Sequence, residues 1–467
     1  MENTILKQIG IYCDNLHFGS LPAEVVHQAK HHLIDGVACA FGAYSIPDVL
    51  PIGVATKVAK ALGRSVESTI LVSGEQSSMD LAAMVNSVMV RYLDFNDTFF
   101  GTAWFIHPSD NISTALAVAE RQRVSGKDFL TAMVLGYEIQ QRFANLPVSE
   151  APWYRGWDPN TSLSYSTAAV AAKLLGLGAD GIANALALAA SRGNTLTQIR
   201  RGQIAMDKAL SIGQIAAASI LAALMAQYGG TGCSTLIEGD FGFNKAVLGG
   251  CDVSSLTKGY DEFLILRSAI KPYPVEYMTI GMMDAALMLR AQHSIRPEEI
   301  QEIRVGVFPE ALTKPSHDPE KLVPQTREAA DHSFHWNIAK VLIDGEMTIK
   351  QCSQNPLEDE RIPKLIEKVN LVVDEELSKL FRKDPTLVPI WMEITTPRGT
   401  FTHRVTCPSG HWKNPLTDDE VVAKLQATAS WALKDGELER LAEATWALEC
   451  VNDVRDEYIP LLVASKI

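Results

Sequence analysis

Apolar residues recur every third or fourth position over roughly the first 260 residues, and this period predicts a series of α-helices. The predicted helices cover residues 22–40, 79–90, 110–119, 128–143, 164–175, 179–190 and 211–228. The helix at 211–228 is apolar almost all round, so we expect it at the centre of a helical bundle.

The pattern changes after about Leu266, where short alternating segments predict strands. Residues 300–307 and 369–373 read as strands, and 389–396 with 400–407 read as a β-hairpin with Gly399 in its turn. Helices are expected at 277–293 and 332–344, and again at 418–433 and 437–450. The expected fold is therefore mainly α: an all-α helical domain (1–267 and 405–467) interrupted by a smaller α+β lid domain (268–404).

A length of 467 residues favours two domains, and 47% hydrophobic with 21% charged residues is typical of a soluble globular protein. The net charge of −13 makes nucleic acid and anionic membranes poor partners. An anionic substrate would therefore need a local cluster of Lys, Arg and His.

Three further features bear on cellular location. Residues 209–237 contain no charge, but the Gly229–Gly232 segment interrupts them, so a buried helix is expected rather than a membrane span. The seven cysteines are dispersed without a C-x-x-C pair, which is typical of a reducing compartment and gives no signature of a metal site. The N-terminus shows no secretory signal pattern, and a cytoplasmic protein is expected.

The segment 91–111, RYLDFNDTFFGTAWFIHPSDN, mixes acids, hydroxyls and an imidazole with aromatic residues. Such a mixture suits an acid–base site shielded from water. Asp94 lies between Leu93 and Phe95, where a carboxylate is costly unless it is paired. The alternative for Asp94 and His107 is a helix cap and a hydrogen-bonded core histidine.

Four basic residues outside this segment are candidates for an anion-binding pocket: Lys208, Lys271, Arg200 and Arg201. Lys208 lies in a largely apolar stretch and Lys271 lies at the predicted domain junction. The alternatives are an ion pair of Lys208 with Asp207 and simple solvent exposure of Lys271.

Three other motifs favour structural roles. His27 and His31 have helical metal-chelating spacing, but without a nearby third ligand a solvated helix face is the better interpretation. His332 and His335 are three residues apart beside Asp331, and a hydrogen-bonding role is favoured over a metal site. Residues 176–181 match G-x-G-x-x-G, yet they follow a predicted helix, which indicates a helix–helix turn rather than a dinucleotide site.

Several motifs together resemble the 2-methylcitrate dehydratase (MmgE/PrpD) family, which includes cis-aconitate decarboxylase and iminodisuccinate epimerase. The most specific is RYLDFNDT followed by HPSDN, which looks closest to the dehydratase branch. Supporting stretches are 136–138, 173–177, the segment around Lys208, 271–274 and 331–334.

This resemblance implies a helical domain with an α+β lid, homodimers, a cleft between the domains, and catalysis without a metal or organic cofactor. Carried over by position, the family's site falls on Asp94, Thr98, His107, Lys208 and Lys271. Two positions depart from the family pattern. Asp158 replaces the histidine of decarboxylase and epimerase members, as in the dehydratase branch, and Trp336 replaces a tyrosine.

The sequence thus predicts a hydro-lyase that dehydrates a citrate-like tricarboxylate, with 2-methylcitrate favoured. His107 would transfer protons and be oriented by Asp94, while Lys208, Lys271 and Arg200 or Arg201 hold carboxylates. Thr98, Asp158 and His332 are expected to bind the substrate, and no metal ligand is expected. Alternatives are a decarboxylase or epimerase on the same site, and a non-catalytic polycarboxylate-binding protein.

Overall fold

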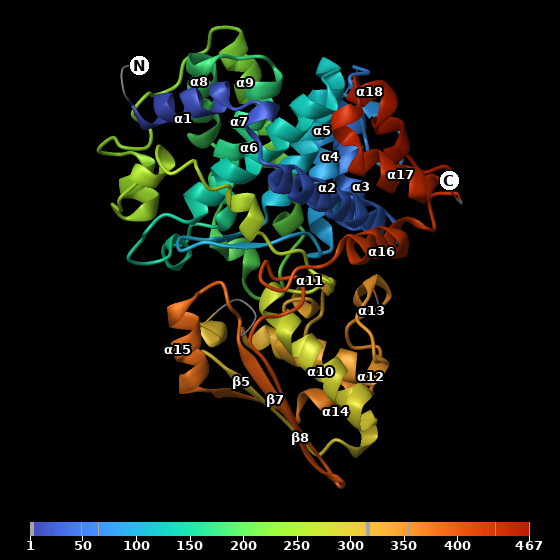
Figure 1. The fold of residues 1–467 in the computed structure, drawn as a ribbon. Coiled ribbons are helices and arrows are strands. Elements are labelled where there is room, and N and C mark those ends of the chain that lie inside the picture. Colours follow the sequence, from blue (N-terminus) through green and yellow to red (C-terminus); the bar gives the residue numbers. More distant parts are fainter. Residues whose placement is uncertain are drawn as a thin grey trace.

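The computed structural model describes residues 4–47, 49–63, 65–313, 318–353, 355–434 and 436–466. The chain forms a larger helical lobe and a smaller α+β lobe, which lies below it in Figure 1. One hydrophobic core takes residues from Leu6 to Ile270 and from Val421 to Leu462. The second takes residues from Ala269 to Val405, together with Phe100. The smaller lobe is thus inserted into the chain of the larger one.

The larger lobe contains most of the helices, and it confirms those that periodicity predicted for it. Its helices are α1 (Ile5–Asn15), α2 (Ala23–Tyr44), α3 (Leu50–Leu62), α4 (Met79–Tyr92), α5 (Ile112–Gln122), α6 (Gly126–Ala144), α7 (Leu163–Leu174), α8 (Ala179–Ala190), α9 (Asp207–Gln227), α16 (Asp418–Ala429), α17 (Glu437–Trp446) and α18 (Val454–Glu457). The fold is mainly α, as expected.

Helix α9 packs against α4, α7 and α8, which form its principal neighbours. The expectation that it is buried on every side is wrong for one face, where Leu221 is 45% and Met225 57% exposed. Among the described residues, α9 is the helix long and apolar enough to cross a membrane, and half of that stretch is buried inside the protein.

The turn between α7 and α8 contains the G-x-G-x-x-G match. Gly176 adopts φ +76°, a left-handed conformation that glycine accepts without a steric penalty, and Gly178 caps the start of α8. The interpretation of this motif as a helix–helix turn is confirmed.

The smaller lobe is built on a four-stranded sheet in the order β6-β5-β7-β8. Its strands are β5 (Glu302–Val307), β6 (Val369–Val373), β7 (Ile390–Thr396) and β8 (Gly399–Val405). Strands β5 and β6 are parallel, whereas β7 is antiparallel to both of its neighbours. Gly399 ends the β7–β8 turn with φ +129°, so the predicted hairpin is confirmed.

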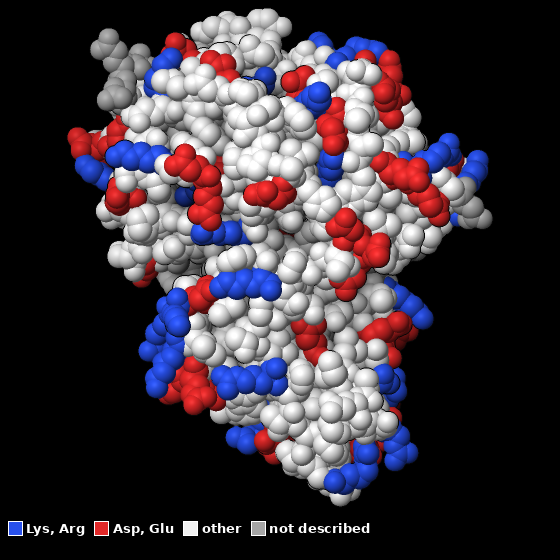
Figure 2. All heavy atoms as spheres, viewed as in Figure 1, with Lys and Arg blue, Asp and Glu red and all other residues white. Residues whose placement is uncertain are grey.

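Helices flank this sheet and connect it to the larger lobe. They are α10 (Ile280–His293), α11 (Arg327–Ala330), α12 (Phe334–Asp344), α13 (Ile349–Ser353), α14 (Arg361–Ile366) and α15 (Glu375–Lys383). Helix α10 packs on β7 and β8 and against α12, while α15 lies at the other side of the sheet in Figure 1. On the face drawn in Figure 2, acidic and basic side chains are interspersed, with a basic group over α15.

The segment 91–111 contains a short hairpin that the sequence did not predict, β3 (Phe99–Phe100) with β4 (Phe105–Ile106). A second short pair, β1 (Ser68–Thr69) with β2 (Gln76–Ser77), lies before α4. Beside the first hairpin, Thr98 and Ala269 form an antiparallel bridge through backbone hydrogen bonds of 2.8 and 2.7 Å. The bridge joins the 91–111 segment to the chain that enters the smaller lobe.

Candidate active site

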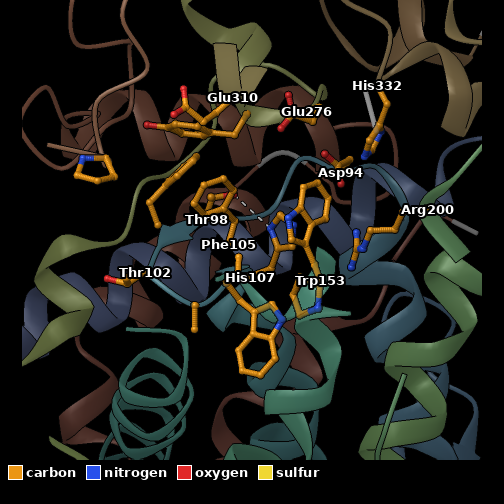
Figure 3. Close-up of a pocket in the computed structure, with 18 of the residues that line it drawn as sticks. Asp94, Thr98, Thr102, Phe105, His107, Trp153, Arg200, Glu276, Glu310 and His332 are labelled. Atoms are coloured by element: carbon orange, nitrogen blue, oxygen red, sulfur yellow. Dashed lines mark hydrogen bonds between the residues drawn. The ribbon is translucent and has the colours of Figure 1, made fainter. Parts of the chain in front are cut away.

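A cavity of about 300 Å³ opens where the two lobes meet (Figure 3). The larger lobe contributes ionisable and aromatic side chains that include Arg91, Asp94, Thr98, His107, Trp153 and Arg200. The chain of the smaller lobe contributes Lys271, Glu276, Glu310, His332 and Phe381. A substrate in this cavity would therefore contact both lobes.

Asp94 lies just beyond the end of α4 and collects three cations. Its carboxylate accepts hydrogen bonds from Arg91 Nη1 at 2.5 Å and Lys271 Nζ at 2.8 Å, and Lys208 Nζ lies 3.2 Å away. Burial alone would raise the pKa of Asp94, but Lys208, Lys271 and Arg91 hold it well below its usual range. Asp94 is therefore a permanent carboxylate that positions cations.

The backbone of Asp94 has φ +50°, a conformation that costs free energy for a residue other than glycine. The same residue accepts a second hydrogen bond from Lys271 Nζ through its carbonyl oxygen, at 2.7 Å. The strained turn thus presents the carboxylate and the carbonyl of one residue to one ammonium group.

His107 follows β4 and lines the cavity with its imidazole ring. Its Nδ1 lies 2.6 Å from the backbone carbonyl of Asp97, and because a carbonyl can only accept, Nδ1 must carry the proton. Nε2 then holds a lone pair. The pKa of His107 lies well below its usual value, mainly because the ring is buried and also because the positive charges of Arg91 and Lys271 disfavour the imidazolium. The ring is therefore neutral near pH 7.

The orientation of His107 differs from the sequence-based hypothesis. That hypothesis made Asp94 the orienting partner, but the Asp94 carboxylate is bonded to the cations and the Asp97 carbonyl orients the ring instead. The Asp97 side chain is itself fixed, because it accepts hydrogen bonds from the Tyr137 hydroxyl at 2.8 Å and the Ser109 backbone N–H at 3.0 Å.

Thr98 and Lys271 are brought together by the bridge described above. Thr98 Oγ1 lies 3.3 Å from His107 Nδ1, and both residues line the cavity. Lys271 is completely buried, which excludes the alternative of solvent exposure at a hinge. Gly410 packs closely on Ile270, the residue before Lys271. A Cβ atom at position 410 would lie 1.8 Å from the Ile270 carbonyl oxygen.

Lys208, in the first turn of α9, lies behind Asp94 rather than among the cavity-lining residues. Its Nζ lies 3.2 Å from the Asp94 carboxylate and 3.9 Å from the Asp331 carboxylate. Lys208 is therefore paired with these residues, and the alternative of an ion pair with Asp207 is wrong. Burial lowers the pKa of Lys208 to about 8.

His332 comes from the smaller lobe and is paired with Asp331 through its Nδ1. Burial and the nearby Lys208 ammonium lower its pKa to about 4, so this ring is also neutral near pH 7. Among the described residues, the group that could hold a metal ion lies elsewhere, at His27, His31 and Asp418. The hydrogen-bonding interpretation of the His332 segment therefore fits the structure better than a metal site.

Arg200 and Arg201 have different surroundings. Arg200 lines the cavity and is held from behind by Asp158, with Nε–Oδ2 at 2.5 Å and Nη2–Oδ1 at 3.1 Å. Asp158 is completely buried and does not line the cavity, so it positions Arg200. Arg201 pairs with Asp318 at 2.5 Å and is not among the cavity-lining residues.

Trp336, the second departure from the family pattern, is also not among the cavity-lining residues. It is buried in the core of the smaller lobe, where its Nε1 donates a hydrogen bond to the Pro356 carbonyl at 2.7 Å. Its effect on the substrate would have to be indirect.

Two regions of the chain match the domains of a known family. Residues 7–256 match the MmgE/PrpD N-terminal domain, and residues 273–449 match the MmgE/PrpD C-terminal domain. The chain belongs to the MmgE/PrpD family.

Curated relatives of this MmgE/PrpD protein are named as lyases. Human cis-aconitate decarboxylase is 26% identical over 97% of this chain and 93% of its own length. The 2-methylcitrate dehydratase of Cupriavidus necator is 28% identical over 82% of this chain and 81% of its own length. The 2-methylcitrate dehydratase of Escherichia coli K12 is 28% identical over 76% of this chain and 75% of its own length. These relatives support a lyase-type enzyme.

The structure adds residues to the site of this family member that sequence reasoning missed. Arg91 is 1% exposed and lines the cavity. The sequence feature that could have indicated it is a lone arginine at the end of the apolar helix α4. Trp153, Glu276 and Glu310 form other parts of the wall. No periodicity or motif marks these three, because their position depends on how the two lobes meet.

Proposed function

We propose that this protein is a hydro-lyase that needs no cofactor and removes water from a citrate-like tricarboxylate, converting 2-methylcitrate to 2-methyl-cis-aconitate. The observation that carries the proposal is that the cavity holds both a neutral base and a buried cation whose N–H groups are not all hydrogen-bonded. His107 presents Nε2 to the cavity, and Arg91 Nε and Nη2 are buried without a hydrogen-bond partner among the described residues.

Arg91, Arg200 and Lys271 would bind the substrate carboxylates. A buried guanidinium with unsatisfied N–H groups is destabilised until an anion accepts from them, which favours a carboxylate ligand. The chain as a whole has a net charge of −13, so this cluster would provide the local attraction that a polyanion requires.

His107 would remove the proton from the carbon beside a bound carboxylate. The electron pair then spreads into that carboxylate as an enolate-like charge, which Arg91 and Lys271 stabilise. The hydroxyl on the neighbouring carbon departs as the double bond forms. The imidazolium created at His107 then donates its proton to the departing oxygen, so that water leaves and the ring returns to its neutral form.

The apolar part of the cavity supports a substrate with a hydrocarbon substituent. Phe100, Phe105 and Phe381 line it together with Trp153. A methyl group gains free energy from contact with such a wall, whereas an additional hydroxyl or carboxylate would lose hydration there. This supports 2-methylcitrate over citrate, as do the relatives named 2-methylcitrate dehydratase.

Decarboxylation of cis-aconitate is the second candidate, and the human relative of that name favours it. Epimerisation of a related polycarboxylate is a further alternative. All three reactions pass through a carbanion beside a carboxylate, so the same cations would serve each of them.

Turnover of 2-methylcitrate, citrate and cis-aconitate by the purified protein tests the proposal. We expect the unsaturated product, followed by its absorbance, to form fastest from 2-methylcitrate, with no release of carbon dioxide. Carbon dioxide release from cis-aconitate would favour the decarboxylase instead. Binding of all three compounds without any turnover would indicate a non-catalytic polycarboxylate-binding protein.

Two further properties belong to the proposal. We infer that the protein acts in the cytoplasm on a small-molecule polycarboxylate, without nucleic acid or membrane partners, and that it forms a homodimer.

A further inference from the structure

Two histidines and a carboxylate meet on the larger lobe, away from the cavity. His27 and His31 lie four residues apart on α2, and Asp418 is the first residue of α16. Both imidazole Nε2 atoms approach the same oxygen, Asp418 Oδ1, at 3.1 Å for His27 and 2.6 Å for His31. The three candidate ligand atoms lie within 4.8 Å of one another.

We propose that these three residues form a binding site for a divalent transition-metal ion of the Zn²⁺ class. Two imidazole nitrogens and one carboxylate oxygen are a ligand set that Zn²⁺ accepts, with metal–ligand distances of about 2.0–2.2 Å. Histidines four apart lie on one face of a helix and can bind one ion together. The third ligand, missing from the sequence around the histidines, comes from a helix nearly 400 residues later.

The ligand atoms must shift to admit an ion. Tetrahedral ligands at those bond lengths are separated by roughly 3.4 Å, so Asp418 has to move outward from His31, 2.6 Å away, and the two imidazole nitrogens, which lie within 4.8 Å of each other, have to reach the same spacing. The Asp418 side chain is 57% exposed and that of His27 is 50% exposed, which leaves room for this movement and for water at a fourth position.

The surroundings hold the histidines in place and favour a cation. The Trp446 ring stacks on His27 with centroids 5.1 Å apart and meets the edge of His31 at 5.2 Å. The first turn of α16 carries Asp419 and Glu420 beside Asp418, which makes the local charge negative. Lys30 lies on α2 nearby but is neutralised by its pair with Glu449.

The ion would join α2 to α16 near the start of α16. Further along this helix, Lys424 Nζ donates hydrogen bonds to the carbonyls of Phe95 at 2.7 Å and Lys271 at 2.9 Å, directly behind the cavity. Lys424 also pairs with Asp35 of α2 at 2.5 Å. The metal would therefore be structural: it would add a second connection between the two helices and stabilise the fold that supports the site.

Titration of chelator-treated, full-length protein with Zn²⁺ tests the proposal. We expect one ion per chain, measured by competition with a chromophoric chelator, and an increase of several degrees in Tm at saturation. His27→Ala and Asp418→Asn should each weaken binding by roughly tenfold or more and reduce the increase in Tm. His17→Ala, at an exposed histidine outside the group, is the matched control and should behave as the unmodified chain.

Co²⁺ substitution distinguishes this site from a thiol site. Cys233 and Cys450 are exposed and could bind added metal, but they would give a thiolate-to-cobalt charge-transfer band that imidazole and carboxylate ligands do not give. Unchanged affinity in both ligand variants, or a thiolate band accounting for the bound cobalt, would overturn the proposal. Turnover should be unchanged in His27→Ala, because the site lies outside the cavity lining.

Discussion

His107 is neutral in the free protein because burial, Arg91 and Lys271 all disfavour its imidazolium form. A neutral ring can accept a proton at once, but its low pKa makes it a weak base. Substrate carboxylates that neutralise Arg91 and Lys271 would remove two of the three causes of the low pKa of His107, so this pKa would rise. Binding and base strength are therefore coupled at this residue.

This coupling predicts a difference between two pH profiles. The active, neutral form of His107 is lost as the pH falls through its pKa, which in the free protein lies well below 6.5. The acid limb of kcat/KM, which reports the free enzyme, should therefore lie below pH 6.5, and the acid limb of kcat should lie at a higher pH. Coincident limbs in steady-state profiles would argue against His107 as the base.

Removal of the base is the direct test of this residue. His107→Ala should lower kcat by roughly 10²–10⁴ with little change in Tm, because general acid–base catalysis contributes about that factor. Thermal unfolding followed by circular dichroism checks that the fold is intact. Near-normal turnover in a variant with unchanged Tm would rule out the assignment.

Single residues show what the sequence could and could not predict about the site. Asp94, Thr98 and His107 were found because they share one unusual segment, and Lys271 because it lies at the domain junction. The partner of His107 was predicted incorrectly. Asp94 binds cations from α9 and residue 271, and these contacts between distant segments leave no local pattern in the sequence.

At the scale of elements, the segment 269–271, through which the chain enters the smaller lobe, positions Lys271. The Thr98–Ala269 bridge fixes one side, and the Ile270 N–H donates to the Gly410 carbonyl at 3.0 Å on the other. The loop at Gly410 thus packs against the segment 269–271 that carries Lys271, and this close contact requires a residue without a Cβ at position 410.

Gly410→Ala should displace the segment 269–271. A Cβ would lie 1.8 Å from the Ile270 carbonyl oxygen, so the backbone must move, in addition to the cost of φ +80°. Gly250→Ala is the matched control, because its φ is +84° with nothing within 4 Å of a Cβ. We expect the control to lose about 1–2 kcal/mol of unfolding free energy, and Gly410→Ala to lose clearly more and to lose activity. Equal losses in denaturant titrations would contradict this packing argument.

Lys271→Ala should raise KM and lower kcat together, each by roughly tenfold, because a charge-assisted hydrogen bond of this kind contributes about 1.5–3 kcal/mol. The lysine binds the carboxylate and the carbonyl of Asp94 and also lines the cavity. Lys271→Arg should restore activity only partly, since a planar guanidinium cannot reproduce both contacts of an ammonium. Steady-state kinetics with a Tm for each variant provides the measurement, and a kinetically silent Lys271→Ala would refute the role.

Elements with a strong period were predictable, and elements defined by contacts were not. The β7–β8 hairpin and α8 were found because alternation or helical spacing runs through them. The two-residue strands β3 and β4 are too short to show a period. Helix α15 was also missed, although its apolar residues follow a helical stripe among many charges.

At the scale of the whole molecule, α3 carries an apolar stripe that the fold leaves exposed. Leu50, Val54, Val58 and Leu62 recur every four residues and are 65%, 40%, 40% and 68% exposed. Helix α3 packs beside α9, whose Leu221 and Met225 are also exposed. Contiguous exposed apolar surface of this kind is typical of protein–protein interfaces.

We propose that α3 and the exposed face of α9 form the interface of the homodimer expected from the family resemblance. A second copy is the occupant that fits, because the same apolar stripe on each chain can pack against its symmetry mate. Helix α3 also carries Lys57 and Lys60, and Lys60 is paired with Glu75. Val54→Glu with Val58→Glu would place carboxylates in this interface, where desolvation without a partner is costly. Sedimentation velocity should then show a monomer, whereas Phe241→Glu, at a fully exposed position, should leave the dimer intact. A dimer that persists in the double variant would place the interface on another surface, and a monomeric unmodified chain would remove the homodimer from the proposal altogether.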